Sequence, residues 1–335
     1  MQTRHLIVDP HHPDSAAIEA AAAVLRRGGL VAFPTETVYG LGANALDGAA
    51  CAGIYTAKGR PGANPLIVHV ASVAEAHQVC ASWPEKAAKL AERFWPGPLT
   101  LVLPKRDCVP DIVTAGGPTV AVRVPAHPVA LALLRACALP LAAPSANRSG
   151  LLSPTQGKHV LAGLAGRIDL VLDAGPTTGG VESTVLDLAH DPPRLLRPGL
   201  VTPAEIEAEI GAISCPAHLT SAEETAMPSP GMLSRHYAPR TPLECLSSGG
   251  AERVNELVDQ GARAGWVTFG ARAAPAGVNV IAIPTEPTAY AARLYAVLHE
   301  LDAAGLTHIV LELPQDTEEW RTVRDRLRRA ATTFQ

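Results

Sequence analysis

Three cationic or ionisable side chains lie inside or at the end of strongly apolar, strand-like segments. His69 lies within Leu-Ile-Val-His-Val, Arg123 within Val-Ala-Val-Arg-Val, and Arg197 at the end of Leu-Leu-Arg-Pro. Arginine is rarely fully buried without an anionic partner, and its planar guanidinium matches carboxylate and phosphate oxygens in bidentate fashion. Two such arginines with a strand histidine predict a pocket for carboxylate and phosphate groups. Taken alone, His69 fits a satisfied core or edge histidine better.

Other polar residues gather where predicted strands begin or end. Thr35, Glu36 and Thr37 directly follow the apolar strand 30–33, at the carboxyl end where α/β sheets place their ligands. Residues 179–184, Gly-Gly-Val-Glu-Ser-Thr, place one carboxylate and two hydroxyls at the start of another strand, and their two glycines allow a close approach to the backbone. Together with the strand cations, these residues predict a site for a small, multiply charged ligand plus a nucleotide.

Two loops supply further groups that can hold phosphate oxygens. Residues 58–66 place two cations and an amide between a helix and a strand, although Lys58 alone could simply interact with the helix C-terminus. Residues 144–150, Pro-Ser-Ala-Asn-Arg-Ser-Gly, follow an apolar strand, and Ser153 opens the next predicted helix. Hydroxyls, amides and a helix N-terminus together bind phosphate, so Ser153 is either a ligand-binding residue or only an N-cap.

The common phosphate-binding and hydrolase motifs are absent from the sequence. Residues 40–45, Gly-Leu-Gly-Ala-Asn-Ala, imitate a dinucleotide fingerprint, but that motif needs a strand directly before it, and here residues 34–39 intervene. The sequence has no Walker A motif, no G-x-S-x-G and no H-E-x-x-H. We therefore expect neither a dinucleotide site nor a standard hydrolase site.

Short apolar runs alternate with alanine-rich helical patterns along the chain, which predicts an α/β protein with buried, partly parallel strands. Strands are expected at 30–33, 66–70, 99–103, 119–124, 139–143, 170–172, 184–188 and 194–197. Helices are expected at 14–27, 47–57, 73–80, 84–93, 128–137 and 203–209. Asp14 and Asp47 are the expected N-caps, and Gly28-Gly29 and Gly59 are the expected C-terminal stops.

The length of 335 residues corresponds to about two domains. Residues 213–242 are rich in Ser, Thr, Pro and Ala and fit neither the helical nor the strand period, so they predict a linker. This linker separates a domain at 1–212 from a smaller Rossmann-like α/β domain at 243–335. In the smaller domain, helices are expected at 251–264, 288–304 and 318–331 and strands at 265–269, 278–283 and 308–313. The last helix carries five arginines, which we interpret as a solvated face.

The composition excludes several classes of protein. Hydrophobic residues make up 47% and charged residues 18%, so the chain can bury a core and is not largely disordered. A net charge of −4 argues against a surface that binds nucleic acid all over, although a local basic patch stays open. Six widely spaced cysteines favour reduced thiols over a zinc site or a disulfide framework. Without a membrane-length apolar run or a signal-peptide pattern, we expect a soluble, cytoplasmic protein.

In their order along the chain, the motifs resemble a known family. PTETVYGLG (34–42), KGRP (58–61), WPGPLT (95–100), VRVP (122–125), PSANRSG (144–150) and ESTVLD (182–187) resemble the YrdC-like catalytic domain of L-threonylcarbamoyl-AMP synthases. SPGMLSRHYAP (229–239) resembles the linker of their long, two-domain form. The resemblance implies a YrdC-like twisted mixed sheet with flanking helices, followed by a smaller Rossmann-like α/β domain. It also implies a nucleotidyltransferase that converts ATP, L-threonine and bicarbonate or CO2 into threonylcarbamoyl-AMP and pyrophosphate.

The resemblance assigns residues to two groups. The implied threonine and carbamate pocket consists of Thr35, His69, Arg123, Ala143 and Ser183. The implied ATP and adenylate contacts are Lys58, Arg60, Asn64, Thr119, Ser145, Asn147, Ser153, Arg197 and Tyr237. No metal is expected to be held by the protein itself, since Mg²⁺ would be held mainly by the ATP phosphates. The adenylate would feed N6-threonylcarbamoyl modification of tRNA through a downstream tRNA threonylcarbamoyl transferase complex.

The residue types fit that chemistry. The threonine amine must be neutral to take up CO2 or bicarbonate, and the resulting carbamate must then attack the α-phosphate of ATP. Lys58, Arg60, Arg197 and phosphate-bound Mg²⁺ would offset the repulsion between the two anions, while Arg123 would hold the threonine carboxylate. No residue stands out as an essential general base, so catalysis is expected to rest on orientation and charge stabilisation.

Residues 229–239 are expected to fold over the nucleotide as a lid, with Tyr237 against ATP, because carbamates and mixed anhydrides are labile in water. A plain flexible tether is the alternative. Two other functions stay open. One is a carbamoyl-transfer enzyme of related fold, although such chains carry paired cysteines that are absent here. The other is an RNA-binding or ribosome-assembly module, whose RNA affinity would fall steeply with salt.

Overall fold

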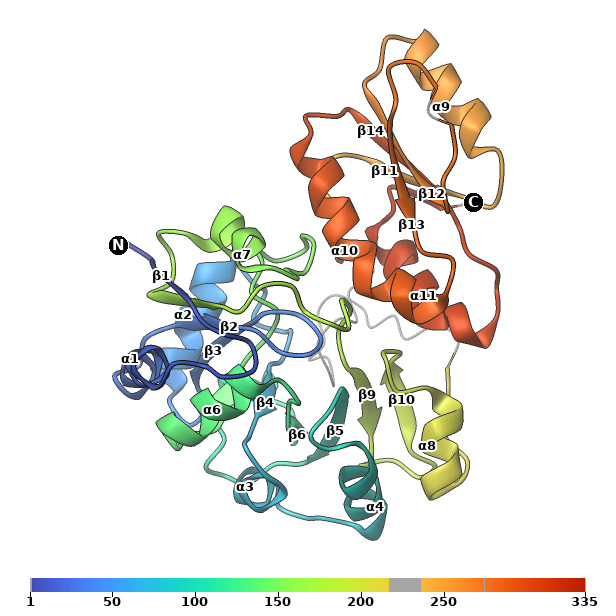
Figure 1. Cartoon of the computed structure of the whole chain (residues 1–335). Helices are drawn as coiled ribbons and strands as arrows, with labels where there is room; N and C mark the ends of the chain where they lie inside the picture. The colour runs from blue at the N-terminus through green and yellow to red at the C-terminus, as the bar shows by residue number, and fades with distance from the viewer. Residues whose placement is uncertain (1, 217–235, 274, 335) are drawn as a thin grey trace. The chain divides into compact units, whose positions relative to one another are not determined.

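The structure, a computed structural model, describes residues 2–216, 236–273 and 275–334. The described residues form two compact units (Figure 1), each considered by itself. The first unit contains residues 2–149, 154–178 and 182–216, and the second contains 150–153, 179–181, 236–273 and 275–334. Residues 217–235, which include most of the predicted linker and of the predicted lid, lie outside the described residues. The domain borders inferred from the sequence therefore stay predictions.

The first unit is built on one ten-stranded mixed sheet with the strand order β1-β8-β2-β3-β7-β4-β6-β5-β9-β10. Its strands are β1 (Arg4–Ile7), β2 (Val31–Phe33), β3 (Gly40–Asn44), β4 (Ile67–His69), β5 (Leu99–Pro104), β6 (Thr119–Arg123), β7 (Leu141–Ala142), β8 (Leu170–Asp173), β9 (Thr184–Asp187) and β10 (Arg194–Arg197). Strands β4 and β6 are parallel, as are β5 and β9, whereas β5 and β6 are antiparallel. The predicted mixed, partly parallel sheet is confirmed.

Helices flank this sheet. They are α1 (Ser15–Arg26), α2 (Gly48–Lys58), α3 (Val73–Val79), α4 (Glu85–Phe94), α5 (Asp111–Thr114), α6 (Pro128–Cys137), α7 (Gly157–Leu164) and α8 (Pro203–Ile210). The predicted N-caps are confirmed, since Asp14 accepts a hydrogen bond from Ala16 N and Asp47 accepts from the backbone of the first turn of α2. Gly59 ends α2 in the left-handed conformation, at φ 61°.

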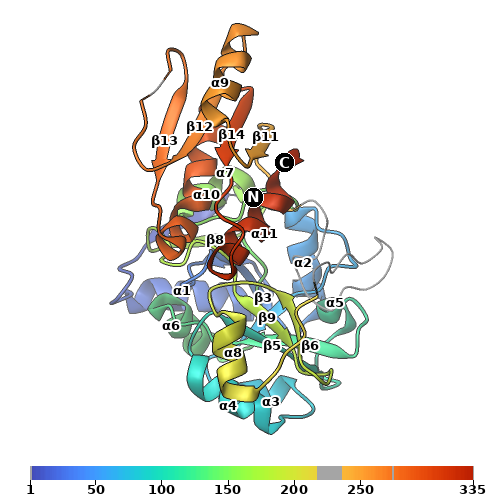
Figure 2. The ribbon, with the colours of Figure 1, turned by 90° about the vertical axis from the view of Figure 1, so that its right-hand side faces the viewer.

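The side chains of each strand alternate between the two faces of the sheet. On β2, Val31 and Phe33 pack with α1 and α6, whereas Ala32 belongs to a larger core that α2, α3, α4 and α7 cover. Helices α1 and α6 lie side by side against the first of these faces (Figure 2). Burial on both faces explains why β2 reads as a continuous apolar run rather than as an alternating one.

The second unit contains a five-stranded, fully parallel sheet with the order β13-β12-β14-β11-β15. Its elements are β11 (Leu243–Leu246), α9 (Gly250–Asp259), β12 (Ala264–Phe269), β13 (Asn279–Ile283), α10 (Pro287–Ala303), β14 (His308–Glu312), a 3-10 turn (Glu318–Trp320), α11 (Arg321–Ala330) and β15 (Thr333–Phe334). The predicted Rossmann-like α/β character is confirmed. Strands β11 and β15 were not predicted, because each is short and lies beside polar or proline-rich sequence.

The glycine-rich segment that imitates a dinucleotide fingerprint is a strand. Residues 40–44 form β3, which pairs antiparallel with β2 and with β7. A Cβ atom at Gly42 would lie 2.8 Å from the ring of Phe33, so glycine at this position makes room for an aromatic side chain. Gly42 thus serves strand packing, and residues 40–44 form a strand where the dinucleotide fingerprint needs a turn before a helix.

Two expectations about local roles are wrong. The helix that follows Ser153 begins only at Gly157 and has Gln156 as its N-cap, so Ser153 does not cap it. On α11, Arg326 is 0% exposed, and its Nη1 pairs with Asp325 Oδ2 at 2.5 Å, so the arginines of this helix do not all lie on a solvated face. The six cysteines, all of which lie in the described residues, form no disulfide in the structure. Among the described residues, no helix has the length and apolar character needed to cross a membrane.

Candidate active site

His69 and Arg123 lie side by side on the sheet of the first unit. His69 ends β4, Arg123 ends β6, and the two residues are partners in the parallel register of these strands. Because side chains alternate along a strand and the preceding residues Val68 and Val122 belong to the large core, His69 and Arg123 face away from that core. Their face of the sheet also carries a small apolar cluster formed by Ile67, Val102, Ala121, Val185 and Leu196.

Arg123 is buried and is held by three oxygen acceptors. Its Nε donates to Gly97 O at 3.0 Å, Nη1 to Thr37 Oγ1 at 3.0 Å, and Nη2 to Glu36 Oε1 at 2.6 Å. Glu36 therefore provides the anionic partner that a buried guanidinium requires. These contacts fix the orientation of the guanidinium at the end of β6.

Thr35 is linked to Arg123 through Thr37. The Thr35 hydroxyl donates to Val38 O at 2.6 Å and lies 2.8 Å from Thr37 Oγ1. Since the single proton of Thr35 is used toward Val38, the Thr37 hydroxyl donates to Thr35 while its oxygen accepts from Arg123. The turn after β2 thus delivers two hydroxyls and one carboxylate to the same place as the strand arginine.

His69 is a neutral imidazole in this environment. Burial, and secondly the neighbouring positive charge of Arg123, lower the pKa of His69 to about 3. Its Nδ1 atom is buried and has no hydrogen-bond partner within the described part of the chain. A neutral imidazole next to a guanidinium can donate or accept one hydrogen bond without adding a second cation to the site.

Ser183 and Arg197 meet at the start of β9. Arg197 Nε donates to Ser183 O at 3.0 Å and Nη2 to Ser183 Oγ at 3.1 Å. The Ser183 hydroxyl also lies 2.8 Å from Thr100 Oγ1 of β5. Gly199 allows this approach of two chain segments, because a Cβ atom there would lie 2.2 Å from Thr184 N. Ser183 of the predicted threonine and carbamate pocket is therefore in direct contact with Arg197 of the predicted ATP and adenylate contacts.

Lys58 joins the loop that follows β7. Its Nζ donates to the carbonyl oxygens of Ser145 and Asn147, both at 2.5 Å, and to Asn147 Oδ1 at 3.3 Å. The Ser145 hydroxyl donates to the same Oδ1 at 2.6 Å. Burial, together with repulsion from Arg60, lowers the pKa of Lys58 well below its usual value. Lys58 does not merely interact with the end of its own helix, since all three of these acceptors belong to another loop.

Arg60 and Asn64 are brought together within the predicted loop 58–66. Arg60 Nε donates to Asn64 O at 3.0 Å, and Nη2 donates to Asn64 Oδ1 at 2.6 Å and to Pro65 O at 2.8 Å. The side-chain amide nitrogen of Asn64 is buried and has no hydrogen-bond partner among the described residues. The loop therefore presents a fixed cation and an open amide donor.

Ala143 and Thr119 occupy different positions on this sheet. Ala143 is buried directly after β7, and its N–H donates to Ile67 O at 2.8 Å, next to the strand residue His69. Thr119 begins β6 and is half-buried. It lies four positions before Arg123, which corresponds to roughly 13 Å along a strand. Ala143 thus belongs to the neighbourhood of His69, whereas Thr119 lies at the far end of β6.

Ser153 and Tyr237 belong to the second unit. Ser153 O lies 3.1 Å from His299 Nε2 of α10. Tyr237 adopts a positive φ of 62°, and its ring centroid lies 5.1 Å from Cζ of Arg326. In this unit, the Ala238 N–H donates to Gly150 O at 3.0 Å. The segment that carries Ser153 is thereby tied to the segment that carries Tyr237.

Three residues of the site belong to neither of the two ligand-binding groups predicted from the sequence. Glu36 and Thr37 contact Arg123, and Thr100 contacts Ser183. The signal for the first two was their place at the carboxyl end of a strand beside Thr35. Thr100 lies inside an apolar strand, where a single hydroxyl gives no indication of its partner on β9.

Several atoms of this site are buried and lack partners. Glu36 Oε2, Asn64 Nδ2 and His69 Nδ1 make no hydrogen bond with any described residue. Since buried polar atoms are nearly always hydrogen-bonded, such atoms mark positions where a ligand can bind. Groups of three or more His, Cys, Asp or Glu side chains able to hold a metal are absent from residues 2–216, 236–273 and 275–334.

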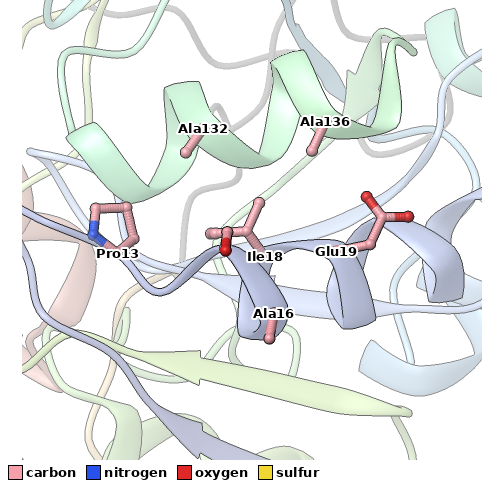
Figure 3. Close-up of a pocket in the computed structure, with 7 residues that line it drawn as sticks. Pro13, Ala16, Ile18, Glu19, Ala132 and Ala136 are labelled. Carbon is pink, nitrogen blue, oxygen red and sulfur yellow. The ribbon is translucent and has the colours of Figure 1, made fainter.

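A hollow between α1 and α6 lies apart from these residues. Pro13, Ile18 and Glu19 line one side of it, and Ala132 and Ala136 line the other (Figure 3). Glu19 is the single ionisable residue of this lining. The hollow therefore lacks the cations that the binding of a phosphate would require.

The chain is similar to known proteins over nearly its whole length. Residues 23–199 match the family model named Sua5_yciO_yrdC, described as "Telomere recombination", and residues 201–332 match the model described as "Threonylcarbamoyl-AMP synthase, C-terminal domain". The chain is 45% identical to a threonylcarbamoyl-AMP synthase of Bacillus subtilis, over 97% of this chain and 96% of the relative. It is 44% identical to the synthase of Pyrococcus abyssi, over 94% of each chain.

A solved structure is similar over nearly the full length. The crystal structure of P. abyssi Sua5 complexed with L-threonine has a TM-score of 0.92 and 41% sequence identity, and the match covers 98% of this chain and 97% of that one. Both family models and these full-length relatives agree with the resemblance seen in the motifs. The chain therefore belongs to the Sua5/YciO/YrdC family, in the two-domain form of the threonylcarbamoyl-AMP synthases.

Proposed function

We propose that this protein is a nucleotidyltransferase that makes L-threonylcarbamoyl-AMP from L-threonine, bicarbonate or CO2, and ATP, with release of pyrophosphate. The observation that carries the proposal is the buried Arg123 beside the neutral His69, with hydroxyls and a carboxylate around the guanidinium. Such a site suits the carboxylate of a small amino acid. The similarity to a Sua5 protein solved with L-threonine supports the same assignment.

The threonine and carbamate pocket consists of Thr35, His69, Arg123, Ala143 and Ser183. Arg123 binds the carboxylate with the N–H groups that its protein partners leave available. The open Nδ1 of His69 forms a hydrogen bond with the substrate. Because His69 stays neutral, it adds no positive charge beside Arg123 that would oppose the approach of a protonated amine.

The ATP and adenylate contacts are Lys58, Arg60, Asn64, Thr119, Ser145, Asn147, Ser153, Arg197 and Tyr237. Arg197 binds Ser183 and so reaches the carbamate and the nucleotide from one position. The open amide of Asn64, held by Arg60, donates to a nucleotide oxygen. Lys58 fixes the loop of Ser145 and Asn147, which presents hydroxyl and amide groups to the ligand.

The reaction joins two anions. Bicarbonate and the neutral amine form a carbamate and water, and a carbamate oxygen then bonds to the α-phosphorus while the bond to pyrophosphate breaks. Arg60 and Arg197 stabilise the charge that collects between carbamate and phosphates. Mg²⁺ would be carried by the ATP phosphates and would neutralise part of their charge when bound.

The product is a reactive mixed anhydride, so a second enzyme must consume it rapidly. We place the protein in the cytoplasm, upstream of a tRNA threonylcarbamoyl transferase complex that transfers the threonylcarbamoyl group to adenosine in tRNA. Pyrophosphate release tests the proposal directly. It should require both L-threonine and bicarbonate, whereas release that is independent of threonine would contradict the assignment.

A further inference from the structure

Glu36 is the residue of the site whose role goes beyond the pocket just described. Its Oε1 accepts from Arg123 Nη2 at 2.6 Å, and the side chains of Arg123 and Glu36 are only 4% and 15% exposed. The other carboxylate oxygen, Oε2, is buried and accepts no hydrogen bond from any described residue. An unsolvated, unpaired carboxylate oxygen is costly, so a ligand group that donates to it would be stabilised strongly.

The donors of Arg123 show what kind of ligand fits. A guanidinium has five N–H groups, and three of them donate to Gly97, Thr37 and Glu36. The two that remain are one on Nη1 and one on Nη2, the number that a bidentate carboxylate needs. The pair therefore offers two donors for an anion and, on the adjoining carboxylate, one open acceptor for a cation.

We propose that Glu36 recognises the ammonium group in which the amino acid substrate first binds, so that Arg123 and Glu36 together select a zwitterion. The ammonium group must lose one proton to solvent before the amine reacts. This inference rests on the proposed binding of L-threonine at Arg123. An α-amino acid carries its opposite charges one carbon apart, which matches the adjoining charges of the ion pair. His69 adds no positive charge beside the ammonium, because burial keeps its imidazole neutral.

The proposal concerns recognition and adds no bond-making step. It predicts selectivity for amino acids over hydroxy acids, since a hydroxyl in place of the ammonium would meet Oε2 without an opposite charge. Charge-assisted hydrogen bonds are about twice as strong as neutral ones. We therefore expect the 2-hydroxy analogue of L-threonine, 2,3-dihydroxybutanoate of the same configuration, to bind about 10- to 100-fold more weakly.

The test is calorimetric titration of the full-length protein with L-threonine and with 2,3-dihydroxybutanoate. Glu36→Gln should weaken L-threonine at least about tenfold while changing the affinity for the hydroxy acid less than about threefold. Glu92→Gln, the same change at an exposed glutamate of α4, is the matched control and should change neither affinity. Equal weakening of both ligands in Glu36→Gln would mean that Glu36 merely orients Arg123, and it would overturn the proposal.

Two further measurements keep the test decisive. Wild-type protein that binds both ligands equally well would overturn the proposal without any variant, which covers the case in which Glu36→Gln does not fold. Glu36→Asp keeps the charge but withdraws it by one methylene, so it should retain part of the selectivity. Arg123→Ala distinguishes a failure of the proposed threonine pocket from a failure of the role proposed for Glu36. If it binds L-threonine normally, the proposed pocket is wrong, whereas weakened binding in Arg123→Ala with unchanged binding in Glu36→Gln overturns only the role of Glu36.

Discussion

His69 and Arg123 are register partners on two parallel strands, and the charge of the arginine helps to keep the histidine neutral. This relationship gives the site one permanent cation and one neutral hydrogen-bonding ring on adjoining strands. A carboxylate can then bind to the guanidinium while the amine of the same ligand meets an uncharged imidazole on the neighbouring strand.

Replacing Arg123 should remove threonine binding. Arg123→Ala leaves Glu36 buried without its cation and removes both donors for the substrate carboxylate, a loss of about 2–5 kcal/mol for a buried charged contact. We expect the KM for L-threonine to rise at least about 30-fold, with a much smaller change in the KM for ATP. Steady-state kinetics of Arg123→Ala beside Arg93→Ala, an exposed arginine of the same unit, measure this. An unchanged KM for threonine would refute the carboxylate role.

Burial of neutral His69 should make the protein less stable in mild acid. The pKa of His69 is lowered to about 3 in the folded protein, whereas an unfolded histidine titrates near 6.5. Between these values the unfolded state binds a proton that the folded state does not, so the free energy of unfolding falls by up to about 1.4 kcal/mol per pH unit as the pH drops.

Urea denaturation at pH 7 and pH 5 tests this expectation. His69→Gln should lose less stability than wild type over this interval, by about 2 kcal/mol. Burial also lowers the pKa of His127, but this contribution is common to both proteins and cancels in the comparison. Equal losses of stability in wild type and His69→Gln would show that the folded imidazole takes up a proton in this range.

A methyl group at Gly199 should separate Arg197 from Ser183. The Cβ atom of Gly199→Ala would lie 2.2 Å from Thr184 N and 2.7 Å from Glu182 O, which are backbone atoms and cannot rotate away. Overpacking of this kind costs about 1–3 kcal/mol and should lower activity more than tenfold. Gly62→Ala, where a Cβ atom meets nothing within 4 Å, is the control. Similar thermal unfolding and activity in the two variants would argue against the close approach.

The cysteines should differ sharply in reactivity. Cys108 is exposed, whereas burial raises the pKa of Cys51, Cys80 and Cys245 to about 12 in each case. Because the thiolate is the nucleophile, a disulfide reagent at pH 8 should modify Cys108 rapidly and these three thiols only when the protein unfolds. Mass spectrometry after partial labelling identifies the modified residues. Labelling of Cys51 or Cys245 at the rate of Cys108 would contradict their burial.

Arg326 should stabilise the second unit. It is fully buried, pairs with Asp325 and lies 5.1 Å from the ring centroid of Tyr237. Arg326→Met leaves Asp325 without this partner and removes the cation–π contact, which should cost about 3 kcal/mol. Arg293→Met changes an exposed arginine of α10 in the same unit and should cost less than about 0.5 kcal/mol. Calorimetric unfolding of both variants measures the difference, and equal stability would show that the buried charge contributes nothing.

Much of this site followed from strands in which a charged residue interrupts an apolar run. His69 and Arg123 could be identified in this way because period-two alternation places both of them on the face opposite the large core. Arg197 reaches the same face through an irregularity in the pairing of β9 and β10, between Leu195 and Arg197. The sequence identified Glu36 and Thr37 only as polar residues that follow a strand. Their contacts with Arg123 join residues nearly ninety positions apart, and such contacts form only when the order of the strands in the sheet brings the two segments together.

The sequence could not predict the strand order β7-β4-β6-β5-β9, which brings Ser183 to Arg197 and Thr100. Strand β3 could not be predicted because glycine is unfavourable in strands. Gly42 occurs in β3 because a larger residue there would collide with the ring of Phe33 on the neighbouring strand. Arg326 was placed on a solvated face because helical arginines usually are exposed. Its burial depends on Asp325 and on Tyr237, which lies about ninety residues earlier in the chain.

Formation of the adenylate itself tests the central claim most directly. Wild-type protein is incubated with ATP, L-threonine and carbon-13 bicarbonate, and the nucleotide products are analysed by mass spectrometry. Our account predicts a threonylcarbamoyl-AMP that carries the label, appears only when all three substrates are present, and is lost in Arg123→Ala. Hydrolysis of ATP without a labelled adenylate, or an adenylate that forms equally well in Arg123→Ala, would contradict it.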